Sequence, residues 1–277
     1  MAPKRRINTA QRQNLSADRL LVFAVSAFAF LLLAAPVLVL LARGISSRAW
    51  EGLPDSATIF SATLLSFAST TAVVCLTAIL GTPLAFMLSR YNFRGKRFVS
   101  LFIELPIVMP PAVAGLALLL TFGRTGAIGS LLADAGIVIP FSILAVIIAQ
   151  FFISAPFYIR SAQVGFAGIA TEIEDAARVD GAYGWLMFWY IILPIAWRAL
   201  ISGMILSWAR ALGEFGATIL FAGNLQGKTQ TMPLLVYSIF ERDIDAAIWT
   251  GLILIVLAMF ALFLSQALAR AQDRLTR

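Results

Sequence analysis

The chain has 277 residues, of which 60% are hydrophobic and only 13% charged, and its formal net charge is +7. Soluble domains are typically about 45–50% apolar and about 25% charged, so this composition indicates a membrane protein. The sequence contains one cysteine and no histidine. An internal disulfide, histidine-based catalysis, a histidine metal site and a Cys/His zinc site are therefore excluded, and we expect no metal site.

Six apolar segments are long enough to cross a bilayer, which requires about 20 apolar residues per helix. They cover residues 20–42, 58–88, 98–121, 137–159, 195–221 and 246–269. The second is over-long, so we expect it to tilt or to extend beyond the bilayer. The sequence predicts an all-α polytopic membrane protein with six transmembrane helices. Residues 1–19 form a polar N-terminal arm, and residues 20–277 form a single transmembrane domain.

Basic residues are unevenly distributed between the loops that these six spans define. If the N-terminus is cytoplasmic, fifteen of the 21 Lys and Arg residues lie inside and five outside, with Arg210 left within a span. Because positive charge concentrates in cytoplasmic loops, we expect both termini and the long loop 160–194 to be cytoplasmic. The basic balance therefore indicates orientation in a lipid membrane rather than nucleic-acid binding.

Several prolines fall within the predicted spans. They are Pro83, Pro106, Pro110, Pro111, Pro140 and Pro156. Proline kinks a helix and frees a backbone carbonyl, which a membrane span tolerates where neighbours or a wet cavity satisfy the freed group. Ordinary kinks explain most such residues. The pair Pro110-Pro111 is the best candidate for a functional break in the translocation path, because it lies near the middle of the third span.

The long inside loop contains a short amphipathic helix with clear start and stop signals. Thr171 and Glu174 fit a capping box, and Gly181 can adopt the left-handed conformation that ends a helix. Three acids lie at the positive end of the helix dipole: Glu172, Glu174 and Asp175. A helix of about nine residues is too short to be stable alone in water. It is either an interfacial helix without a partner or a docking helix.

Two alanines favour docking, because Ala176 and Ala177 would allow another surface to approach closely. From Asp175 to Pro194 the loop reads D-A-A-x3-G-x9-I-x-L-P. This pattern resembles the E-A-A loop of ATP-binding-cassette (ABC) importer permeases, with Asp175 in the position of the glutamate. The resemblance implies that the loop contacts a cytoplasmic ATPase subunit through Glu172, Glu174, Asp175, Ala176, Ala177 and Gly181.

Further motifs resemble the oxyanion branch of these permeases. They are residues 105–115, 212–218, 221–224 and 229–234. The resemblance implies a homodimeric permease of the bacterial plasma (inner) membrane. A dimer of cytoplasmic ATP-binding cassette subunits would energise it, and an external oxyanion-binding protein would deliver the substrate. ATP would be used by the partner, so the chain itself is expected to be no enzyme and to need no cofactor. Molybdate is the expected substrate; sulfate, thiosulfate and tungstate are alternatives.

Arg210 and Glu214 are four residues apart within the predicted fifth span, so they are expected to share a helix face and to form an ion pair. The pair is either structural or part of the translocation path or its gate. Glu104 is a possible third member, although a place near the inner headgroups is favoured. An ion-coupled secondary transporter or channel is the alternative class, and it would be expected to place titratable groups near the bilayer midplane.

Overall fold

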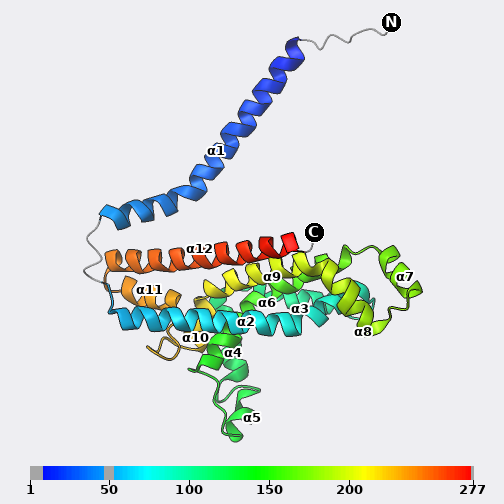
Figure 1. Cartoon of the computed structure of the whole chain (residues 1–277). Coiled ribbons are helices and arrows are strands. Elements are labelled where there is room, and N and C mark those ends of the chain that lie inside the picture. Colours follow the sequence, from blue (N-terminus) through cyan, green and yellow to red (C-terminus); the bar gives the residue numbers. More distant parts are fainter. Residues whose placement is uncertain (1–8, 47–52, 276–277) are drawn as a thin grey trace.

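The computed structural model describes residues 9–46 and 53–275, with side chains at 19–46 and 53–263. The described part is helical throughout and contains no strand (Figure 1). The elements are α1 (Thr9–Ser46), α2 (Ser56–Arg90), α3 (Lys96–Val108), α4 (Pro111–Phe122), α5 (Gly129–Asp134), α6 (Ile143–Ala167), α7 (Thr171–Val179), α8 (Gly184–Met187), the π-helix η2 (Phe188–Ile192), α9 (Leu193–Leu212), α10 (Gly216–Phe221), α11 (Met232–Phe240) and α12 (Ile244–Leu275).

Five helical stretches are long and apolar enough to cross a membrane, and a bent pair of helices brings the number to as many as six. The five are Arg19–Ser46, Ser56–Arg90, Ile143–Ala167, Gly184–Leu212 and Ile244–Phe263. The predicted all-α membrane architecture is therefore confirmed. The predicted N-terminal arm is helical from Thr9 onward, and its first eight residues lie outside the described part.

The third predicted span, residues 98–121, is wrong as one continuous helix. The chain forms α3 and α4, whose axes differ by 119° at the break between them. Met109 and Pro110 both have extended backbone there. The ring of Pro111 disfavours the helical conformation in the residue before it, and Pro111 cannot donate a backbone hydrogen bond. The predicted break at Pro110-Pro111 is thus present, either inside a broken span or at the tip of a re-entrant one.

The fourth predicted span, residues 137–159, begins and ends too early. Phe141 has a positive φ of 59°, and the Ser142 hydroxyl caps α6 by accepting from the Ala145 N–H at 3.4 Å. The helix then continues to Ala167. The residues after 159 stay helical because this part of α6 packs against α2 and α9.

The fifth predicted span, residues 195–221, is also wrong in both limits. A continuous helical stretch starts at Gly184 and ends at Leu212, so that α10 is a separate helix. A π-turn at η2 lies just before Pro194. Because proline cannot bond to the carbonyl of residue i−4, the wider turn lets the helix pass it. The predicted loop 160–194 therefore shrinks to residues 168–183, and the predicted outer loop 222–245 contains α11.

The centre of the bundle is formed by α2, α6 and α9, which lie side by side in Figure 1. Small residues line their contacts, as at Gly81 against Tyr158 and at Gly203 against Ser161. Such residues let membrane helices approach closely. The helix α1 contacts α12 but leans away from the bundle and leaves its large apolar side chains exposed (Figure 1).

The two helices that follow the breaks, α4 and α10, pack directly on each other. A Cβ added at Gly115 would lie 2.9 Å from the carbonyl oxygen of Ala217, and one added at Gly216 would lie 2.6 Å from Cβ of Pro111. Only glycine permits this approach. Both helices then cover α6 through a core cluster that includes Ala114, Leu118 and Phe221.

Candidate functional site

The expected helix in the long loop is present as α7, nine residues from Thr171 to Val179. The predicted capping box is wrong. Ala170 occupies the N-cap position and no side-chain capping bond is formed, so Thr171 is the first helical residue. Glu174 consequently lies one position too far into the helix, and its carboxylate binds the Arg90 guanidinium instead. A buried charged partner stabilises the carboxylate more than a capping bond does.

The two neighbouring acids of α7 point in opposite directions. Glu174 faces the bundle with its side chain 11% exposed, and its Oε1 lies 2.6 Å from Nη2 of Arg90. Asp175 faces outward with its side chain 66% exposed, 2.6 Å from the Arg178 guanidinium. Of the residues predicted to contact an ATPase, Glu174 and Ala177 are buried against the bundle, and their contact with a partner stays a prediction. Those that remain exposed are Glu172, Asp175, Ala176 and Gly181.

The outer face of α7 also carries apolar residues that the sequence analysis missed. Ile173 and Val179 flank Ala176 at intervals of three residues, and Val179 is 88% exposed. Residues three apart lie on one helix face. The three-residue spacing of positions 173, 176 and 179 is the sequence signal that could have revealed this apolar face. An apolar stripe beside Asp175, exposed outside the spans, is the surface expected of a docking helix.

Gly181 ends the helix as expected, with a φ of 88°. Its N–H donates to the Arg178 carbonyl at 3.0 Å, and the Ala182 N–H donates to the Ala177 carbonyl at 2.9 Å. No atom lies within 4 Å of where a Cβ would be, so a side chain there meets backbone strain rather than a clash.

We expect Gly181→Val to destabilise the end of α7 by about 1–2 kcal/mol, because a residue with a Cβ resists positive φ. The protein should still insert and remain folded, while protease cleavage at residues 178–184 accelerates. Gly136→Val is the matched control, since Gly136 also has positive φ and open space but lies in another loop. Unchanged cleavage in the Gly181 variant would contradict the strained cap.

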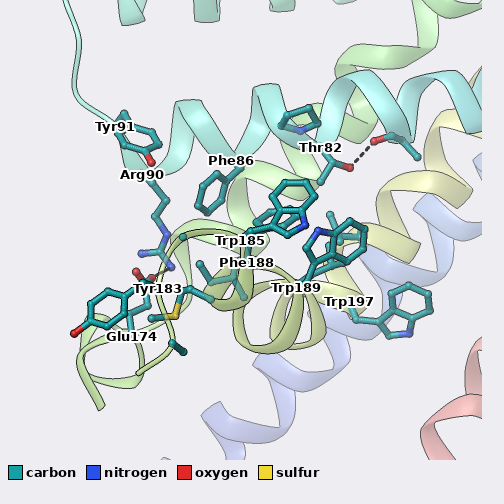
Figure 2. A pocket seen from close by; sticks show the side chains of 18 of the residues that line it. Thr82, Phe86, Arg90, Tyr91, Glu174, Tyr183, Trp185, Phe188, Trp189 and Trp197 are labelled. Atoms are coloured by element: carbon teal, nitrogen blue, oxygen red, sulfur yellow. Dashed lines mark hydrogen bonds and ion pairs between the residues drawn. The ribbon is translucent and has the colours of Figure 1, made fainter. Parts of the chain in front are cut away.

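A cavity of about 1030 Å³ lies beside α7, between α2 and the α8–η2–α9 stretch. Figure 2 shows the aromatic side chains of Trp185, Trp189 and Trp197 around it, with Arg90 and Glu174 at one side. Trp185 and Tyr190 are strongly exposed. This fits the preference of aromatic rings for the membrane–water boundary. The end of the bundle that holds α7 therefore lies at a membrane surface.

The predicted ion pair of Arg210 and Glu214 forms, with 3.0 Å between Nη1 and Oε2. The expectation that both residues lie on one continuous helix is wrong, because α9 ends at Leu212. Glu214 lies in the break that follows, with its side chain 1% exposed. Its Oε1 accepts from the Ala217 N–H at 2.8 Å. One carboxylate thus pairs with the end of α9 and caps the start of α10.

The structure brings the two sets of predicted path residues together. Pro111, at the first break, packs against Gly216, which lies two residues after Glu214 at the second break. Glu104 does not join them; its carboxylate pairs with Arg160 of α6. Pro110 and Pro111 are exposed, whereas Glu214 is buried.

The helix α9 lies between the loop that contains α7 and this break. It has 20 residues and therefore spans about 30 Å. The loop that contains α7 precedes the N-terminal end of α9, and the Arg210–Glu214 ion pair lies at its C-terminal end.

The chain is thus a bundle of membrane helices in which α4 and α10, the helices after the two breaks, pack on each other and a short charged helix is exposed at one end. Residues 78–277 match the family described as binding-protein-dependent transport system inner membrane component. The chain belongs to this family, as the membrane-spanning permease component of an ABC importer.

Curated relatives agree with this assignment. The chain is 37% identical to the probable transport system permease protein NifC of Clostridium pasteurianum, over 91% of this chain and 88% of the relative. It is 42% identical to the molybdenum transport system permease protein ModB of Mycobacterium tuberculosis, over 72% and 75%. A probable sulfate transport system permease protein of Chlorokybus atmophyticus is 33% identical over 85% and 84%.

Solved structures share the fold at low sequence identity. A bacterial ABC transporter that imports the acidic polysaccharide alginate matches with a TM-score of 0.75 and 16% identity, over 94% of this chain and 98% of that one. An inward-facing methionine ABC transporter matches with a TM-score of 0.60 and 16% identity, over 81% and 98%. The predicted type I importer architecture is therefore confirmed.

Proposed function

We propose that the chain translocates molybdate, with sulfate, thiosulfate and tungstate as the alternative oxyanions. The relatives named for molybdenum transport support molybdate; the sulfate relative is the reason to keep the alternative. The motifs at 221–224 and 229–234 also favour the molybdate branch.

The same proposal assigns partners and orientation. The end of the bundle with α7 is cytoplasmic, as are both termini, and a dimer of ATP-binding cassette subunits docks on the exposed face of α7. A second copy of the chain completes the pore, and an external binding protein delivers the anion. The positive-inside charge distribution supports the orientation. The exposed apolar stripe at Ile173, Ala176 and Val179 supports the proposed docking surface for the cassette subunits.

The observation that carries the mechanism is the geometry of the docking helix and α9. Closure of the cassette subunits on ATP moves α7, and α9 carries the movement to the break at Glu214. Rigid-body movement of this kind switches a transporter between two openings. The chain performs no hydrolysis in this scheme and requires no cofactor of its own.

The path is not expected to hold the anion tightly. A dianion needs uncompensated positive charge, yet Arg210 is neutralised by Glu214 at 3.0 Å. Selectivity should therefore reside in the external binding protein, while the permease passes what it is given.

The test is uptake of labelled molybdate, tungstate and sulfate into proteoliposomes that contain the chain, its cassette subunit and its binding protein. We expect molybdate to be taken up at least about tenfold faster than sulfate at equal concentration, which corresponds to about 1.4 kcal/mol of discrimination. Preferential sulfate uptake would move the assignment to the sulfate alternative.

A further inference from the structure

Arg90 is the last residue of α2, and no role follows for it from the docking motif. Its guanidinium reaches the loop in two places. Nη2 lies 2.6 Å from Glu174 of α7, and it also donates to the Ile169 carbonyl at 3.4 Å, in the turn that leads into α7. Both contacts are made by this one nitrogen, and together they join the turn and α7 to the end of α2 through a charged group.

The remaining contact between α2 and this part of the loop is incomplete. The cavity described above separates α2 from much of the α8–η2 segment. Phe86 bridges part of the gap, with ring centroids 5.5 Å from Phe166 and 5.2 Å from Phe188. In Figure 2 the Arg90 side chain extends from the end of α2 past this gap to Glu174. The ion pair therefore joins α2 to α7 at a place where the cavity interrupts apolar packing between the two helices.

The ion pair is shielded enough to hold its geometry. The side chains of Arg90 and Glu174 are 16% and 11% exposed. Removing one member of such a pair leaves the other charge buried and poorly compensated. Arg178 cannot replace Arg90, because its guanidinium lies 3.7 Å from Glu174, on the same helix, and is bound more closely to Asp175.

We propose that the Arg90–Glu174 ion pair couples α2 to the docking helix, so that α2 moves with α7 when the cassette subunits close. Arg90 is a positioning residue for the coupling of ATP hydrolysis to transport. The inference rests on the proposed docking role of α7. The proposal assigns different functions to the two neighbouring acids of α7. Asp175 faces the ATPase, and Glu174 holds α7 to α2, the first helix of the central bundle.

The test uses the full complex in proteoliposomes, with the variants Arg90→Gln, Glu174→Gln and the double variant. The quantity measured is substrate taken up per ATP hydrolysed. Each single variant should still bind the cassette subunit, because Asp175 and Ala176 remain exposed, but the transport-to-ATP ratio should fall roughly tenfold. The double variant should recover part of the ratio, since two amides can bond without an unpaired buried charge. Arg94→Gln, an exposed position in the following turn, is the matched control and should behave as wild type.

A role confined to folding would lower uptake and hydrolysis together and leave their ratio unchanged, which would overturn the proposal. A normal ratio in both single variants would overturn it as well. If Arg90→Gln fails to accumulate, Glu174→Gln decides, because it removes the same ion pair from the other side; an unaltered ratio there would contradict the proposal. If wild-type chain itself fails to bind a cassette subunit, the docking proposal fails first, and this outcome is separate from failure of the ion pair alone.

Discussion

Replacing Glu214 with glutamine is expected to destabilise the protein by about 3 kcal/mol and to abolish most transport. The side chain is 1% exposed and is the carboxylate partner of Arg210. Removing one member of a buried pair typically costs about 3–5 kcal/mol, and we expect the lower value because Arg210 is itself 31% exposed. Glutamine keeps an oxygen that can accept from the Ala217 N–H, so the variant isolates the loss of charge.

The measurement is thermal unfolding of the purified variant together with uptake. Arg210→Met combined with Glu214→Gln should be milder than Glu214→Gln alone, because no buried charge is left unpaired. Glu104→Gln is the control: its pair with Arg160 is more exposed and should contribute less than about 1 kcal/mol. Strictly additive effects of the Arg210 and Glu214 changes would show that the two residues do not act as a pair.

Replacing Ala176 with arginine is expected to release the cassette subunit. Ala176 lies in the middle of the exposed stripe on α7, where a long charged side chain would hold a partner surface away. We expect this steric and electrostatic interference to cost at least about 2 kcal/mol of binding free energy, so binding should weaken roughly 30-fold or more. The change leaves the bundle intact, because the side chain points away from it.

The measurement is the affinity of the purified cassette subunit for the membrane-embedded chain. The control is Ala135→Arg, because Ala135 is also an exposed alanine but lies outside the helices. This variant should bind the cassette subunit normally. Normal binding by the Ala176 variant would show that the outer face of α7 is not the dock.

The sequence predicted the membrane class, the short helix α7 and its glycine end correctly because each depends on local signals. A long apolar segment indicates a membrane span regardless of the segments that pack against it. Gly181 ends α7 through a positive φ, which glycine adopts without steric strain. The pairing of Arg210 with Glu214 was likewise predictable from charges placed among apolar residues.

What the sequence could not predict depends on contacts between distant segments. Arg90 is separated from Glu174 by 83 intervening residues, so nothing local reveals that Glu174 faces inward and that the capping box is displaced. The breaks at Pro110-Pro111 and at Gly213–Phe215 are adjacent because α4 and α10 pack through Gly115 and Gly216. The C-terminal limit of the fourth span moved for the same reason, since α6 packs on α2 and α9 beyond its apolar stretch.

We expect this chain to move its substrate only when a docked ATPase drives it. The most direct measurement is the ATP dependence of uptake into proteoliposomes that contain the chain, the cassette subunit and the loaded binding protein. We predict uptake when hydrolysable ATP is present on the side of α7, and none with a non-hydrolysable analogue or without the binding protein. Uptake driven by an ion gradient in the absence of ATP would contradict the account and would instead indicate a secondary transporter.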